Sequence, residues 1–177
     1  MRRQVLLAGF LVAGMWAFDT GVAAGCGDKF VMIGRGIRVA RSAFPSMILI
    51  FMNPNSRVPA ADKEFHVEAT LKAAGHKAVV VESQAEVQKA LASGKYDLVL
   101  ADVADTPALR KEAGAAASKP VVLPLLYKPT PEEISAAEKE ANCMARPSTK
   151  SRDLLVVVDE TMKSRKNGGA AICDTAH

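Results

Sequence analysis

Short apolar runs alternate with longer segments of helical periodicity from residue 46 onward, and this alternation constrains the fold more than any other feature of the sequence. The runs are nearly continuous in apolar character, which is typical of parallel strands buried on both faces of a sheet. Strands and helices that alternate in this way predict a three-layer α/β domain with a parallel sheet at its centre. We therefore expect a single domain over residues 46–166 with five parallel strands, at residues 47–52, 78–81, 98–101, 121–126 and, most weakly, 143–145.

The segments between these runs have the length and spacing of helices. Apolar residues at helical spacing predict one helix over residues 59–74, which ends at Gly75 because glycine accepts the left-handed backbone conformation. The same spacing over residues 154–162 predicts a last helix. Residues 156–158 are three valines, which would also suit a buried strand, but the length of the segment and its place in the alternation favour a helix.

Capping signals mark the starts of three further helices. Ser83 and Glu86 are three residues apart, which is the spacing of a capping box. Thr106 and Thr130 each precede a proline, and Glu133 follows Thr130 at the capping-box distance. We expect these hydroxyl groups to accept hydrogen bonds from the first turns of their helices.

The N-terminal residues have the order of a bacterial export signal. Arg2 and Arg3 precede an apolar stretch at residues 5–18, and small residues lead up to Ala24. A membrane anchor needs about 20 apolar residues, and this stretch is shorter and ends at Asp19. We therefore expect residues 1–24 to be a cleaved signal peptide and the protein to be periplasmic or secreted.

Two other routes of processing remain open. Cys26 follows small residues, as in a lipoprotein, and a lipid on this cysteine is the one way in which we expect the protein to contact a membrane. The pair Arg2-Arg3 suits a twin-arginine signal. The CGDKF segment at residues 26–30, with Gly-Arg-Gly at residues 34–36, is similar to the mature ends of some exported bacterial proteins, a likeness that brings no activity with it.

The remaining segments flank the domain. Residues 25–45 precede the alternation and are expected to form an extended arm that lies on the domain. Residues 167–177 begin with Asn-Gly-Gly and continue with small residues, which is typical of a flexible tail.

Three cysteines lie in the exported part of the chain, where an oxidising compartment favours disulfides. We expect Cys26 to pair with Cys143, because this bond would tie the arm to the domain while Cys173 lies in the tail. A bond between Cys143 and Cys173 is the alternative. Neither the cysteines nor the histidines have the spacing of metal ligands, so no metal site is expected.

Charge and composition bear on the class of ligand. The formal net charge is +4, but the basic residues are interspersed with acidic ones rather than clustered. Aromatic residues make up 5% of the chain, which leaves few side chains on which bases or sugars could stack. We therefore expect neither a nucleic-acid partner nor a cofactor.

The order of strands and helices, together with the sequence GKYDLVLADV at residues 94–103, strongly resembles the middle of a response-regulator receiver, a flavodoxin-like domain. In that family a strand of this kind ends in the aspartate that accepts phosphate, so the resemblance places Asp102 there. Residues 143–148 resemble the fifth strand, which in receivers ends in Lys-Pro. Arg146 then replaces the lysine and Pro147 keeps the proline.

The receiver chemistry that this resemblance implies is incomplete. An aspartate takes up a phosphoryl group only with a divalent cation, which receivers hold with an acidic pair after the first strand. The matching positions here are Asn53 and Asn55, which are uncharged amides, and the fourth run has no hydroxyl at its end. Lys128 with its following proline also resembles the Lys-Pro pair, but that match would leave the C-terminal part of the chain outside the fold. We expect no phosphorelay activity.

Ligands of open α/β sheets bind beyond the carboxyl ends of the strands. The candidate pocket at this edge consists of the residues that follow the predicted strands, namely Asn53, Asn55, Asp102, Asp105 and Arg146, with Lys128 nearby. Asp102 also has a structural interpretation, in which it caps the next helix or pairs with Arg146.

These observations favour an exported, non-catalytic receiver-like module that binds an envelope protein or a small ligand. Two alternatives are a single-lobe periplasmic solute-binding-like protein and a hydrolase that uses Asp102 or Asp105. The hydrolase has less support from the sequence, which lacks a nucleophile elbow, a glycine-rich phosphate loop and a cluster of metal ligands.

Overall fold

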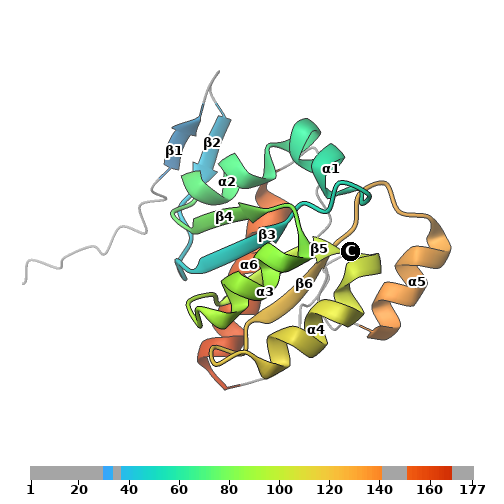
Figure 1. The fold of residues 1–177 in the computed structure, drawn as a ribbon. Coiled ribbons are helices and arrows are strands. Elements are labelled where there is room, and N and C mark those ends of the chain that lie inside the picture. The colour runs from blue at the N-terminus through green and yellow to red at the C-terminus, as the bar shows by residue number, and fades with distance from the viewer. Residues whose placement is uncertain (1–29, 34–36, 141–150, 169–177) are drawn as a thin grey trace, which may run out of the picture.

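A computed structural model of the chain describes residues 30–33, 37–140 and 151–168 (Figure 1). Within this part, four parallel strands form the main sheet: β3 (Met47–Phe51), β4 (Lys77–Val81), β5 (Leu98–Asp102) and β6 (Val121–Leu125). Their order in the sheet is β4-β3-β5-β6. The α/β class and the parallel sheet are thus confirmed. The described sheet has four strands rather than the predicted five, and residues 143–145 lie outside the described residues.

Helices cover both faces of this sheet, as predicted (Figure 1). One face packs against α1 (Val58–Phe65), α2 (Val67–Ala73) and α6 (Ser151–Lys166). The other face packs against α3 (Gln84–Ala92) and α4 (Thr106–Ala115). Successive strand residues point to opposite faces, so Ile48 and Ile50 lie in the first core while Leu49 and Phe51 lie in the second. A further helix, α5 (Pro131–Glu140), buries Ala137 in a smaller cluster with Leu126.

The prediction of one helix over residues 59–74 was wrong, because His66 separates α1 from α2. Its φ of 51° is left-handed, and its backbone N–H donates to the carbonyl oxygen of Asp62, which ends α1. Asp62 Oδ1 then accepts the backbone N–H of Glu68 at 2.8 Å, in the first turn of α2. The side chain of Asp62 therefore stabilises the break. Gly75, at φ 98°, adopts the left-handed conformation expected of it.

The capping signals had different outcomes. Ser83 and Glu86 form the predicted capping box of α3. Thr130 Oγ1 accepts from the N–H of Glu133, while the Thr130 N–H donates to the Glu133 carboxylate, so this box is also present. Thr106 does not cap α4, because its hydroxyl donates to the carbonyl oxygen of Asp102 at 3.0 Å. A short 3₁₀ turn, η1 (Val103–Asp105), instead links β5 to α4. The three valines at residues 156–158 lie within α6, as predicted.

The predicted extended arm contains a two-stranded antiparallel sheet. It pairs β1 (Phe30–Ile33) with β2 (Ile37–Ala40), in the register Phe30 to Ala40 (Figure 1). Val39 of β2 is 2% exposed and belongs to the core formed with α6. Two apolar runs around Gly-Arg-Gly are a hairpin signal, which could have identified this element from the sequence.

Several predictions concern residues outside the described part. They include the signal peptide at residues 1–24 and the pairing of Cys26 with Cys143 or of Cys143 with Cys173. Among the helices that the structure describes, none has the length and apolar character needed to cross a membrane.

Candidate functional site

The strand order places a topological switch point between β3 and β5. The chain leaves β3 through α1 and α2 toward β4 on one side of the sheet, and it leaves β5 through α4 toward β6 on the other. The two connections therefore diverge beyond the carboxyl ends of β3 and β5. Such a divergence opens a crevice, and ligands of open α/β sheets bind in crevices of this kind.

A cavity of about 250 Å³ lies at this switch point. Its lining comes from the segments that follow the two strands, and consists of Asn53, Asn55, Ser56, Arg57, Asp102, Ala104 and Asp105. We call it the switch-point cavity. The structure thus brings together four of the five residues of the predicted pocket, Asn53, Asn55, Asp102 and Asp105. The fifth, Arg146, lies outside the described residues.

Asp102 is held by the backbone on both carboxylate oxygens. Oδ2 accepts the N–H of Arg57 at 3.0 Å, and Oδ1 accepts the N–H of Ala104 at 3.1 Å. The residue is 7% exposed and ends β5, where every residue is buried. The bond to Ala104 caps η1, the short 3₁₀ helix that follows β5, which agrees with the interpretation of Asp102 as a cap of the next helix. Asp102 thereby joins the connection after β3 to the connection after β5.

Asn53 organises one wall of the cavity. Its Nδ2 donates to both oxygens of Asp105, at 3.1 and 3.2 Å, and its Oδ1 accepts the N–H of Asn55 at 3.0 Å. The hydroxyl of Ser56 donates to the carbonyl oxygen of Asn53 at 2.8 Å, which closes the turn after β3. The amide N–H groups of Asn53 therefore point at the carboxylate of Asp105. An acidic residue at position 53 would instead bring a second negative charge to this carboxylate.

The electrostatics of this wall affect Asp105. Desolvation raises the pKa of its carboxyl group above the ordinary value, and the negative charge of Asp102 raises it further. The hydrogen bonds from Asn53 act in the opposite direction and lower the pKa, but their effect is smaller than that of desolvation. A partly desolvated carboxylate of this kind favours a ligand that supplies positive charge or hydrogen-bond donors.

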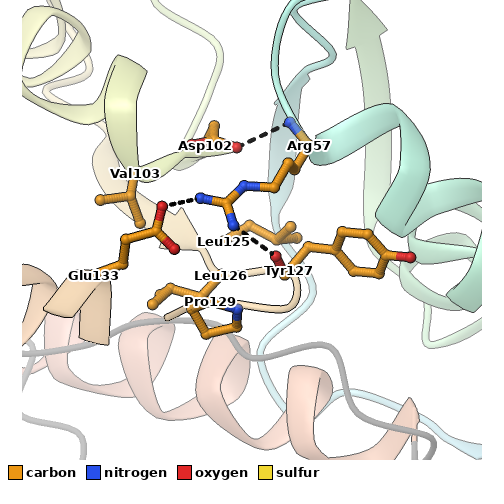
Figure 2. Close-up of a pocket in the computed structure, with 8 residues that line it drawn as sticks. All are labelled: Arg57, Asp102, Val103, Leu125, Leu126, Tyr127, Pro129 and Glu133. Carbon is orange, nitrogen blue, oxygen red and sulfur yellow. Dashed lines mark hydrogen bonds and ion pairs between the residues drawn. The ribbon is translucent and has the colours of Figure 1, made fainter. Parts of the chain in front are cut away.

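Arg57 links the site to the start of α5, as Figure 2 shows. Its guanidinium forms an ion pair with Glu133 and donates to the carbonyl oxygens of Tyr127 and Lys128, at 3.4 and 3.3 Å. The hydrogen bond that Arg57 donates to the Glu133 carboxylate is the main cause that raises the pKa of Arg57. A cavity of about 10 Å³ beside this group, lined also by Asp102 and Leu125, has room for about one water molecule.

The sequence patterns do not single out Arg57, and they place Lys128 near the pocket. Lys128 is directed elsewhere, because its Nζ lies 2.8 Å from the carboxylate of Glu64 and 4.7 Å from the ring centre of Tyr127. Arg57 is the one cation among the described residues that line the switch-point cavity, and its guanidinium is directed toward Glu133 (Figure 2). Its position directly before a Val-Pro helix start was the only signal in the sequence.

Among the residues that the structure describes, no three histidine, cysteine, aspartate or glutamate side chains are grouped so that they could hold a metal ion. No protein-family model matches the chain, and comparisons with curated proteins and with solved structures give no significant match.

Proposed function

We propose that this protein is an exported, non-catalytic module with a receiver-like fold, and that it binds a small polar ligand in the switch-point cavity. The observation that carries the proposal is the state of Asp102, whose two carboxylate oxygens both accept backbone N–H groups. A phosphoacceptor must present an oxygen lone pair to the incoming phosphorus atom. Asp102 is only 7% exposed, and its two hydrogen bonds hold the carboxylate in this buried orientation, so an incoming phosphorus atom has little access to its remaining lone pairs.

The strand order supports the receiver-like part of the proposal. Numbered among themselves, the four parallel strands follow the order 2-1-3-4, and the flavodoxin-like order is 2-1-3-4-5. The predicted fifth strand at residues 143–145 would add to the sheet beside β6.

The side chains at the cavity also argue against phosphorelay. A divalent cation needs several oxygen ligands, commonly carboxylates. Here the Nδ2 group of Asn53 points its hydrogens at Asp105, so that a donor group stands where a cation would need an acceptor. The burial and fixed orientation of Asp102 also weigh against a hydrolase that uses it, because a nucleophile or general base needs an accessible oxygen.

The cavity favours a ligand with hydrogen-bond donors over an anion. Asp105 offers a desolvated carboxylate, and Asn55 and Ser56 lie beside it. The guanidinium of Arg57, which an anion would need, is already paired with Glu133. We therefore propose a ligand that carries an ammonium or hydroxyl group.

The proposal can be tested by following backbone amide signals in isotope-labelled protein. Magnesium with acetyl phosphate or beryllium fluoride is expected to leave the mass and the Ala104 amide signal unchanged. Stoichiometric modification that is lost in Asp102→Asn would overturn the non-catalytic assignment.

A second titration tests the ligand class. The probe 2-aminoethanol is expected to shift the Asn55 and Arg57 amides saturably, and Asp105→Asn is expected to abolish the shifts. Glu82→Gln is the matched control, since it removes an exposed acid that does not line the cavity. Saturable binding of inorganic phosphate with no response to 2-aminoethanol would contradict the proposed ligand chemistry.

A further inference from the structure

Residues 41–46 connect β2 to β3 and lie at the end of the sheet opposite the switch-point cavity. We call them the strap. The Ser42 N–H donates to the carbonyl oxygen of Ala74 at 2.8 Å, and the Lys77 N–H donates to the carbonyl oxygen of Ser46 at 2.9 Å. These two bonds tie one end of the strap to Ala74, just after α2, and the other end to the first residue of β4.

Two side-chain pairs hold the strap as well. The hydroxyl of Ser42 donates to the carboxylate of Asp159 on α6, and the Ala43 N–H reaches the other oxygen of this group at 3.4 Å. At the other end, Ser46 Oγ lies 2.9 Å from His76 Nδ1. Phe44, in the middle of the strap, packs on the core beneath Lys166.

His76 is the unusual member of this set. It is 4% exposed, and its Nε2 is buried with no hydrogen-bond partner among the residues that the structure describes. A neutral imidazole can donate from Nδ1 to Ser46 and leave Nε2 as an unpaired acceptor. An imidazolium would place an additional N–H and a positive charge at the same buried position, which is costly.

We propose that His76 makes the attachment of the strap sensitive to protons, so that acidification releases the strap together with β2. Opening of the strap would expose His76 to water, where the imidazole accepts a proton at its ordinary affinity. Protonation therefore favours the open form. The released surface would include Val39, which is buried against the core in the closed form.

The electrostatic surroundings of His76 give the sign of this effect. Burial lowers the pKa of His76 below the ordinary 6.5, and the negative charge of Asp159 on α6 raises it by a smaller amount. The two hydrogen-bond partners of His76 in the described part of the chain are uncharged, because its backbone N–H donates to the carbonyl oxygen of Leu71 in α2 and its ring contacts Ser46 of the strap. The neighbouring Lys77 is exposed.

The linkage between opening and protonation follows from this sign. Between the lowered pKa of the closed form and about 6.5, the open form binds more protons than the closed form. The opening equilibrium constant should therefore rise by up to about tenfold for each unit of pH lost in this window, the limit for one proton. Below the lowered pKa the effect levels off.

Amide hydrogen exchange between pH 7 and 5, corrected for intrinsic rates, tests this inference. The amides of Ser42 and Lys77 are expected to lose protection as the pH falls, while that of Leu100 in β5 keeps its protection. In His76→Gln, whose amide side chain can still bond to Ser46, the pH dependence is expected to vanish. His66→Asn is the matched control, because His66 is exposed and distant from the strap in the chain.

A second variant keeps the test independent of the stability of His76→Gln. Ser46→Ala is expected to weaken protection at every pH and to keep the pH dependence, since His76 remains. Equal protection of Ser42 at pH 7 and 5 in the wild type would overturn the inference. So would an unchanged pH dependence in His76→Gln, or a parallel loss of protection at Leu100, which indicates global unfolding instead.

Discussion

The carboxylate of Asp102 accepts the backbone N–H of Arg57, 45 residues earlier in the chain, at 3.0 Å. With the second bond to the Ala104 N–H, this side chain fixes the two connections that border the switch-point cavity. Asp102 therefore has a structural role that does not depend on any reaction.

Replacing Asp102 with asparagine should destabilise the protein. An amide has one acceptor oxygen, so either the Arg57 or the Ala104 N–H would face an NH₂ group and lose its partner. We expect a loss of about 1–3 kcal/mol in the free energy of unfolding, measured by urea denaturation. Glu82→Gln, an exposed control, should change it by less than about 0.5 kcal/mol. Equal effects of the two substitutions would contradict this role of Asp102.

Asp105 should make the folded protein less stable as its carboxyl group ionises. Because its folded-state pKa lies above the ordinary 3.8, the folded protein binds more protons than the unfolded chain between these two pH values. The free energy of unfolding thus falls as the pH rises through this window and stays lower above it. Asp105→Asn should remove this contribution, so its stability relative to wild type should be greater at pH 7 than at pH 3. A difference that does not vary with pH would refute the raised pKa.

The pair formed by Arg57 and Glu133 should contribute little, whereas Arg57 itself should contribute more. Both side chains are more than a third exposed, so Glu133→Gln is expected to lower the free energy of unfolding only slightly. Arg57→Ala also removes the donor to the carbonyl oxygens of Tyr127 and Lys128, and should cost up to about 2 kcal/mol. Urea denaturation of both variants and of the double variant separates the contributions. A larger loss in Glu133→Gln than in Arg57→Ala would be inconsistent with this assignment.

His66→Gly should stabilise the break between α1 and α2. A left-handed conformation costs a residue with a Cβ atom about 1–2 kcal/mol, and glycine avoids this cost while losing more backbone entropy on folding. We expect a net gain of about 0.5–1 kcal/mol, seen as a higher melting temperature. His66→Ala serves as the control, since it removes the imidazole but keeps the Cβ atom, and it should give no gain.

Export can be checked by the intact mass of the protein recovered outside the cytoplasm of a bacterial host. We expect a chain that starts at or near Gly25, because the small residues before it suit signal peptidase. An added mass of lipid size on Cys26 would support the lipoprotein alternative. A soluble cytoplasmic form that keeps residues 1–24 would exclude cleavable export.

Short sequence signals correctly predicted the elements that are stabilised by contacts between residues close together in the chain. The capping box at Ser83 and Glu86 depends on groups three residues apart, and the structure contains it. The helix over residues 59–74 was predicted too long, because the bond from Asp62 to Glu68 can stabilise a break that apolar spacing does not reveal. The position of Thr106 before a proline predicts a cap, but the hydroxyl of Thr106 instead donates to the nearby carbonyl oxygen of Asp102.

The candidate site was predicted only where a strand end could be recognised. Asp102 and Asn53 follow apolar runs, so their meeting at one edge of a parallel sheet could be inferred. The role of Arg57 could not be inferred from the sequence, because its partner Glu133 is 76 residues away and charged residues occur along the whole chain. Which of them pair depends on how the loops after β3 and β6 approach each other.

The two backbone hydrogen bonds that Asp102 accepts reduce the entropy that is lost when a small molecule binds in the cavity. Much of the cost of recognising a small molecule is the entropy lost when loops and side chains become ordered around it. Here the N–H groups of Arg57 and Ala104 already anchor the two loops at the rim, and Asn53 already orients Asp105. A molecule that enters the cavity meets a preorganised wall, so its affinity depends mainly on how well it satisfies the hydrogen-bonding groups of Asp105, Asn55 and Ser56.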